Sequence, residues 1–196
     1  MSIPILETDR IVVRPLTLDD LDACHALYRD IGWVDTEASE KANLEQRLGW
    51  LKWTIASYEQ LAQLMMPPYG ERAVVDKASG QLVGNVGLVP LLQPFGQLPS
   101  FGAQRGCRHT PEVGLFWAVA PKHQRQGFAT AAGRALIDFA FEHLRLNRII
   151  AGTERDNKAS MSVMKKLGMR IEENPFETPE WFQVLGILQC ESGGSR

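Results

Sequence analysis

One short stretch, QRQGFA at 124–129, has residue types and a spacing that suit phosphate binding. It stands where a strand pattern ends and a helical pattern begins, and a helix start presents unpaired backbone N–H groups with a partial positive charge. Gly127 has no Cβ and Ala129 has only a methyl group, so a phosphate can approach the backbone there. Arg125 adds a charged hydrogen-bond donor. The stretch predicts that a pyrophosphate binds at the start of this helix.

Other interpretations of this stretch compete with phosphate binding. Glycine before a helix often serves turn geometry alone, in which case 120–133 is only a turn in a structural or interaction protein. The commonest phosphate loops of nucleotide-binding proteins, G-x-G-x-x-G and G-x-x-x-x-G-K-S/T, do not occur in the sequence. The hexapeptide therefore belongs to neither of those classes, and the elements around it decide what it does.

The apolar periodicity places this stretch in a mixed order of strands and helices. Strands are expected at 9–15, 72–76, 82–89, 112–120, 147–153, 168–173 and 181–189, and helices at 17–27, 36–64, 128–144 and 160–167. The 36–64 pattern fits one amphipathic helix or a pair, and the segment 90–111 is expected to be a long loop. Gly168 is expected to end the last helix in left-handed geometry. The order predicts an α/β or α+β sheet with helices on its faces, in a single domain over 1–196 with a frayed tail at 190–196.

The second half of the chain resembles the GNAT superfamily of N-acetyltransferases, which are acyl-CoA-dependent enzymes. The likeness rests on EVGLFWAVAP, QRQGFA, NRIIAGT and NKASMSVMKKLGMR, and QRQGFA matches the family loop Q/R-x-x-G-x-G/A. The opening LETDRIVVRPLTLDDLD is similar to the subfamily that includes the ribosomal-protein-alanine N-acetyltransferases. The resemblance implies a GNAT fold: a mixed, mostly antiparallel sheet of about seven strands, splayed at the acetyl-CoA site and flanked by helices.

The resemblance also implies the reaction and its co-substrate. A primary amine, either a protein N-terminal α-amine or a small-molecule amine, attacks the thioester of acetyl-CoA directly in a ternary complex, without a metal. The implied acetyl-CoA site consists of Trp117, Ala118, Val119, Gln124, Arg125, Gln126, Gly127, Ala129, Thr130, Asn157 and Ser160. In this site the backbone at 117–119 stabilises the acyl oxygen, and Asn157 holds the pantetheine amide.

Acetyl transfer needs a base for the ammonium and a proton donor for the leaving thiolate. Glu112 is the expected base and His109 the second choice, although Glu112 could equally lie in solvent or pair with a neighbouring arginine. Ser160 is the expected donor, because Met164 stands where many family members carry a tyrosine. Ser160 and Asn157 are also ordinary residues for a helix start.

The acceptor is expected to enter between 30–60 and 90–111, as the resemblance implies. Arg105 and Arg108 in the second segment favour an acceptor with a negative group. The missing tyrosine leaves a rival interpretation, an acyl-CoA-binding sensor or scaffold domain without turnover.

The composition argues against several other classes of function. A net charge of −2 at pH 7 argues against a dedicated nucleic-acid-binding protein. The three cysteines, Cys24, Cys107 and Cys190, are far apart and form neither a disulfide framework nor a zinc site. No signal-peptide pattern and no membrane-length apolar run is found, so a cytoplasmic location with no membrane partner is expected. The sequence leaves the oligomeric state open, with a homodimer as one expectation.

Overall fold

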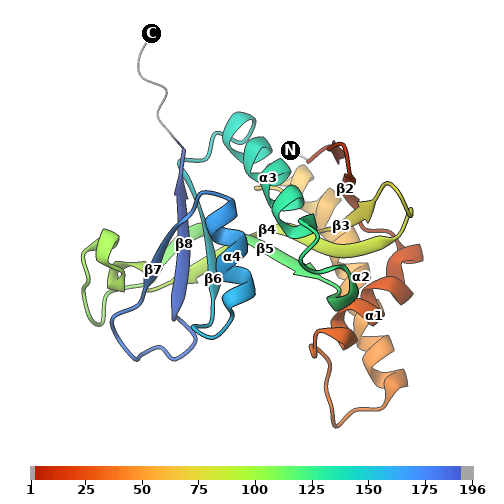
Figure 1. Ribbon diagram of the computed structural model, residues 1–196, viewed down its shortest axis with the longest axis horizontal. Helices are drawn as coiled ribbons and strands as arrows, with labels where there is room; N and C mark the ends of the chain where they lie inside the picture. Colours follow the sequence, from red (N-terminus) through yellow and green to blue (C-terminus); the bar gives the residue numbers. More distant parts are fainter. Residues whose placement is uncertain (1–2, 191–196) are drawn as a thin grey trace. The chain divides into compact units, whose positions relative to one another are not determined.

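The computed structural model describes residues 3–190, and within them eight strands form one sheet in the order β1-β2-β3-β4-β5-β6-β8-β7 (Figure 1). The strands are β1 (Leu6–Glu7), β2 (Ile11–Pro15), β3 (Gly70–Asp76), β4 (Leu82–Gln93), β5 (Thr110–Val119), β6 (Arg148–Thr153), β7 (Arg170–Glu173) and β8 (Val184–Gln189). The sheet is mostly antiparallel, and β5 and β6 form a parallel pair. The expected mixed α/β class is confirmed, with eight strands in place of about seven.

The longest helix contains the whole central part of the 36–64 pattern. The helices are α1 (Leu21–Asp30), α2 (Glu40–Gln63), α3 (Phe128–Glu142) and α4 (Lys158–Lys166). The single helix α2 therefore decides between the two expected arrangements. Ser39 caps its start by accepting a hydrogen bond from the N–H of Ala42 at 3.2 Å.

The chain divides into two compact units, each built from two segments. The described part of the first unit contains residues 3–88 and 116–136, and that of the second contains 89–115 and 137–190. The chain passes from one unit to the other inside β4, β5 and α3. Neither unit is therefore continuous in sequence, and the expectation of a single domain stays a prediction.

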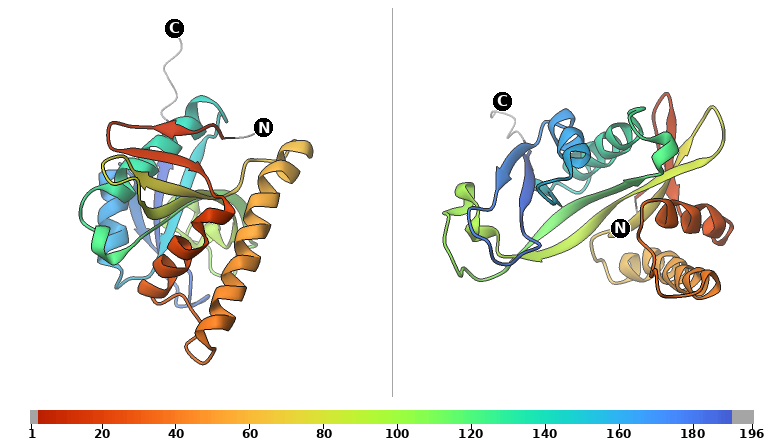
Figure 2. Two further views of the ribbon diagram at one scale, coloured as in Figure 1. Left: turned by 90° about the vertical axis from the view of Figure 1, so that its right-hand side faces the viewer. Right: turned by 60° about the horizontal axis from the view of Figure 1, so that its bottom comes forward.

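In the first unit, β1 to β4 form antiparallel pairs, and α1 and α2 lie side by side (Figure 2). Their apolar faces are buried around Leu16, Cys24, Leu51 and Ala73. This packing is what the amphipathic patterns at 17–27 and 36–64 predict, because each helix needs an apolar partner for its stripe.

In the second unit, α4 lies against β6, β7 and β8 (Figure 1). The core of this unit contains Phe95, Leu98, Ile150, Phe182, Leu185 and Ile187. The expectation of a long loop over 90–111 was partly wrong, because β4 continues to Gln93 and two short 3-10 turns bury Phe95 and Leu98. Gly168, with φ at +83°, ends α4 in the left-handed geometry that was expected.

Candidate active site

The predicted phosphate-binding stretch forms an exposed turn in the first unit, between a short 3-10 turn and α3. Arg125 and Gly127 have φ values of +59° and +87°. Within residues 3–190, no oxygen accepts a hydrogen bond from the backbone N–H of Arg125, Gln126 or Gly127. A Cβ added to Gly127 would have one atom within 4 Å, the Nη1 of Arg10 at 3.9 Å. Exposed N–H groups beside a helix start and a left-handed glycine suit a phosphate of CoA.

Arg10, which no motif in the sequence indicates, stabilises this turn. Its Nη1 donates a hydrogen bond to the backbone oxygen of Gln126 at 2.7 Å, and its guanidinium lies 4.8 Å from the centre of the Phe128 ring. The contact joins residues 116 positions apart, so no local pattern could reveal it. Arg10 fixes the carbonyl next to Gly127 and brings a positive charge to the predicted phosphate site.

The strand end before the turn is closely packed. Ala118 and Val119 are buried, and Trp117 is half-buried. Gly84 on β4 faces them, and a Cβ there would overlap the carbonyl oxygen of Ala118 and lie 3.1 Å from the Cα of Val119. Gln124 Nε2 donates to the carbonyl oxygen of Val119 at 3.1 Å. The side chain of Gln124 therefore ties the turn to the end of β5, and a contact between this side chain and phosphate stays a prediction.

The remaining side chains of the predicted turn take different positions. Gln126 Nε2 donates to the carbonyl oxygen of Lys122 at 3.2 Å, which closes the turn on itself. Ala129 and Thr130 are half-buried in the first turn of α3, where the helix leaves its first N–H groups unpaired. Residues 124–127 are thus exposed, and they lead directly into the half-buried first turn of α3.

In the second unit, Glu112 forms an ion pair with Arg148. The Nε of Arg148 donates to Oε2 of Glu112 at 2.7 Å, and its Nη2 donates to Oε1. The side chain of Glu112 is only 9% exposed, and the hydrogen bonds to its carboxylate raise the pKa of Arg148. Pairing with a neighbouring arginine, the alternative left open by the sequence, is therefore realised. Catalysis by Glu112 stays a prediction, and both its oxygens are engaged in joining β5 to β6.

The other candidate base, His109, is exposed next to the start of β5. Of the two arginines expected to favour an anionic acceptor, Arg105 lies 5.3 Å over the ring of Phe176, and Arg108 is exposed. The structure gives these three residues no shared contact.

Asn157 and Ser160 meet at the start of α4 in the second unit. Oδ1 of Asn157 accepts a hydrogen bond from the backbone N–H of Ser160 at 3.0 Å, so Asn157 caps the helix. Among the described residues, the hydroxyl of Ser160 has no hydrogen-bond partner, and the residue is half-buried. The cap leaves the Ser160 hydroxyl available for proton transfer and occupies one acceptor position of Asn157.

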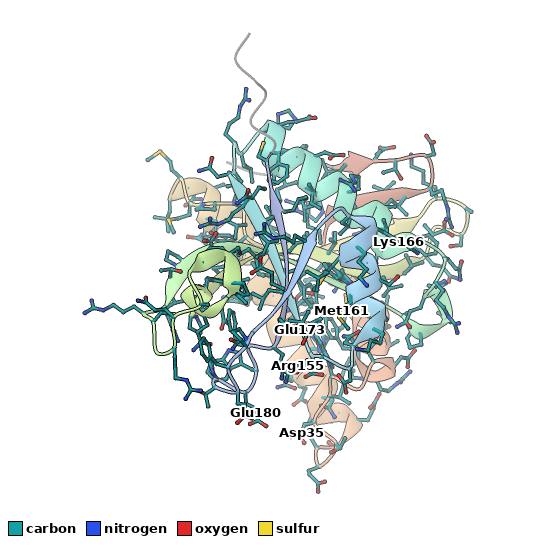
Figure 3. The ribbon with its side chains drawn as sticks, turned by 60° about the vertical axis from the view of Figure 1, so that its left-hand side comes forward. Asp35, Arg155, Met161, Lys166, Glu173 and Glu180 are labelled. Atoms are coloured by element: carbon teal, nitrogen blue, oxygen red, sulfur yellow. The ribbon has the colours of Figure 1, made fainter. Side chains whose placement is uncertain are left out.

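Figure 3 shows Met161 and Lys166 on α4 and places Arg155 near Glu173, with which it forms an ion pair at 3.7 Å.

Met164, which stands where many family members have a tyrosine, is a core residue. It is fully buried, and its Sδ would lie 3.0 Å from a Cβ added to Gly186 on β8. Its thioether fills the space that a glycine leaves on the facing strand. The side chain at position 164 therefore packs in the core and has no proton to donate.

The first unit also contains a polar group of three side chains that was not predicted from the sequence. Glu71 on β3 accepts a hydrogen bond from the hydroxyl of Tyr28 on α1, and Asn85 Nδ2 on β4 donates to the same Oε2 at 3.3 Å. Burial raises the pKa of the Glu71 carboxyl. Glu71 lies directly before the strand expected at 72–76, so in the sequence it is indistinguishable from a charge at a strand end.

No helix within residues 3–190 has the length and apolar character that crossing a membrane requires. The same residues bring no three His, Cys, Asp or Glu side chains together as metal ligands.

Comparison with known proteins identifies the family. The family model described as acetyltransferase (GNAT) domain matches residues 10–170. The uncharacterized N-acetyltransferase YoaA of Bacillus subtilis (strain 168) is 27% identical over 170 residues, 86% of this chain and 84% of that protein. YnaD, another uncharacterized N-acetyltransferase of this bacterium, is 42% identical over 64 residues, 33% of this chain and 36% of the relative.

A solved structure of similar fold is the ribosomal-protein-S5-alanine acetyltransferase from Vibrio fischeri. It has a TM-score of 0.66 and 16% sequence identity, with 97% of this chain and 98% of that chain covered. The family model covers far more than half of the chain and includes both the 124–130 turn and the α4 cap. The chain therefore belongs to the GNAT family and is an acetyl-CoA-dependent N-acetyltransferase.

Proposed function

We propose that this protein transfers the acetyl group of acetyl-CoA directly to a primary amine in a ternary complex, the acceptor being a protein N-terminal α-amine or a small-molecule amine. The observation that carries the proposal is the 124–130 turn. The backbone N–H groups of residues 125–127 donate no hydrogen bond to any described residue, Gly127 is left-handed, and Arg10 lies beside the turn. These are the features that a pyrophosphate requires of a backbone site.

The remaining site residues have roles that follow from this placement. The backbone at Trp117, Ala118 and Val119 is proposed to stabilise the acyl oxygen, because N–H groups fixed in a buried strand need no reorganisation during reaction. Ser160 is proposed to protonate the leaving sulfur, since its hydroxyl is not used in the α4 cap. Asn157 is proposed to contact the pantetheine arm through its amide nitrogen.

A Vibrio fischeri protein of similar fold is named for acetylating the alanine of a ribosomal protein, which makes a protein N-terminus a natural member of the acceptor panel. At 16% identity this likeness shows the fold alone, so small-molecule amines belong in the same panel. The panel we propose contains short peptides beginning with alanine, serine or glycine, together with free amino acids, spermidine and an aminoglycoside.

The test combines binding and turnover in one set of variants. Gly127→Glu places bulk and negative charge at the predicted phosphate position, so calorimetry should detect no CoA binding at about 1 mM. The matched control is Gly49→Glu, because Gly49 is exposed on α2 and a Cβ there meets no atom within 4 Å. Wild-type affinity for CoA in the Gly127→Glu variant would contradict the site assignment.

A further inference from the structure

The carboxylate of Glu71 is held at one oxygen and accessible at the other. Tyr28 and Asn85 both donate to Oε2, whereas no hydrogen bond from the described residues reaches Oε1. Asn85 also donates to the hydroxyl of Tyr28 at 3.3 Å, which closes a three-membered polar group. Asn85 is fully buried, but Glu71 is only half-buried. The geometry orients one carboxylate oxygen and leaves the other for a ligand.

Aromatic side chains surround this polar group within the first unit. The ring of Tyr28 lies 5.9 Å from that of Trp33 and 5.5 Å from that of Trp50, and Trp33 lies 5.9 Å from Phe116. Trp33 is 57% exposed, an unusual position for a large apolar ring. The guanidinium of Arg47 already lies over Tyr28 and Trp50, at 3.7 Å and 4.8 Å from their ring centres. The exposed ring of Trp33 is therefore the aromatic face left for an ammonium group, and the Glu71 carboxylate adds charge complementarity.

The polar group shares its packing with the strand that is proposed to hold the acyl oxygen. Tyr28 belongs to one buried cluster with Ala118 and Ala120, against which Phe116 packs. Gly84, the residue before Asn85, would bring a Cβ against the backbone of Ala118. The carboxylate of Glu71 is thus connected through Tyr28 and Asn85 to the face of β5 at Ala118.

We propose that Glu71 binds the ammonium group of the acceptor and removes its proton, with Tyr28 and Asn85 as positioning residues. This inference rests on the proposed function, since it assigns the base of the same reaction to Glu71 in place of Glu112, whose two oxygens are paired with Arg148. It also explains why a carboxylate is retained at a half-buried position without an arginine or lysine in hydrogen-bond contact with it.

The proposed step balances without a further reactant. The ammonium gives one proton to Glu71, and the lone pair of the neutral nitrogen forms the C–N bond to the acetyl carbon. The C–S bond breaks, and the sulfur of CoA leaves with its electron pair. The nitrogen then loses its second proton, and the sulfur takes up one proton through the hydroxyl of Ser160, so the products are an amide and the CoA thiol. Glu71 then returns its proton to water.

The ionisable groups around Glu71 allow its titration to be recognised. They are Cys24 and Tyr28 on α1, and Arg47 and Tyr58 on α2. Burial raises the pKa of Cys24 to about 12 and also raises the pKa of both tyrosines, so these three stay neutral near pH 7. The guanidinium of Arg47 favours the ionised form of Glu71 and opposes the effect of burial on its pKa. Because burial raises the pKa of Glu71, activity should fall on the acid side at a higher pH than for an exposed glutamate.

The variant Glu71→Gln tests the inference. The glutamine side chain has the same shape as glutamate but cannot accept a proton. We therefore expect kcat/KM with an acceptor from the panel to fall about 100-fold or more, and the loss to lie in kcat. The decrease in activity on the acid side of the pH profile should also disappear. Tyr28→Phe should cost less, and Glu71→Asp should restore part of the rate. The control Glu142→Gln changes an exposed glutamate at the end of α3 and should leave all values unchanged. A Glu71→Gln enzyme with the wild-type rate and the wild-type acid limb would overturn the inference.

A binding measurement separates this inference from the proposed function. With CoA present, tryptophan fluorescence is titrated with butylammonium and with glycinamide, and Glu71→Gln should weaken saturable binding at least about tenfold. Equal binding to both proteins, or no saturable binding to the wild type, would overturn the role of Glu71. If the proposed function fails instead, the wild type neither binds CoA nor releases it when an amine is added. The melting temperature of each variant shows that it is folded.

Discussion

Replacing Arg10 with alanine should weaken CoA binding although Arg10 lies outside the recognised loop motif. In the wild type its guanidinium holds the carbonyl oxygen of Gln126 at 2.7 Å and lies over the ring of Phe128. Loss of these contacts frees the peptide next to Gly127, whose left-handed conformation turns the N–H groups outward. The variant also removes a positive charge from the predicted phosphate site.

The size of the effect follows from the exposure of the contact. A hydrogen bond from a charged donor contributes about 1.5–3 kcal/mol when buried, and the exposed Arg10 should retain about 1 kcal/mol of this. The lost charge adds about 0.5 kcal/mol at low salt. Together these terms predict a dissociation constant roughly tenfold higher, measured by calorimetry with CoA.

Two comparisons make the experiment on Arg10 decisive. Arg10→Lys keeps the charge but not the planar donor group, so its affinity should lie between those of the wild type and the alanine variant. Lys52→Ala removes an exposed positive charge from α2 and should leave affinity unchanged. The reasoning would be refuted if Arg10→Ala bound CoA as tightly as Lys52→Ala at low salt.

Three further predictions concern the packing around the site. Gly84→Ala should destabilise the protein by about 2 kcal/mol or more, because the new methyl group overlaps the backbone of Ala118. Thermal unfolding measures the loss of stability, and an unchanged midpoint would contradict the prediction. Asn157→Ala should lower the free energy of unfolding in urea by about 1 kcal/mol, whereas Asn157→Ser, which retains a capping oxygen, should cost little. Glu112→Gln should lower the melting temperature because it breaks the ion pair with Arg148, and its kcat should stay within about threefold of the wild-type value. A loss of kcat of about 100-fold at an unchanged melting temperature would instead identify Glu112 as the base.

Local features of the site could be predicted from the sequence. The turn at 124–130 depends on a glycine, small neighbours and a helix start, all of which lie within a few residues. The end of α4 at Gly168 is local in the same way. Such features are encoded by backbone conformation, so the sequence pattern and the structure agree.

Contacts between residues far apart in the sequence could not be predicted in this way. Glu112 meets Arg148 because β5 and β6 are neighbours, and Arg10 meets Gln126 from the far end of the chain. Glu71 looked like an ordinary charge before an apolar run until α1 and β4 brought Tyr28 and Asn85 to it. Predicting these pairs requires the strand order, which no local periodicity contains.

The segment 90–111 shows a different reason for a partly wrong expectation. Its prolines and lack of periodicity indicated a loop, but Phe95 and Leu98 are buried by two 3-10 turns that have no repeating pattern. Tertiary packing decided the structure of this segment, and composition alone could not reveal it.

The central claim is tested most directly by measuring CoA release from acetyl-CoA with a thiol dye while the amine panel is added. The account predicts release that depends on a primary amine and on acetyl-CoA, with the acetylated product detected by mass spectrometry. It also predicts that Gly127→Glu abolishes this release and that Gly49→Glu retains it. Release that no amine increases, or a Gly127→Glu protein as active as the wild type, would contradict the account.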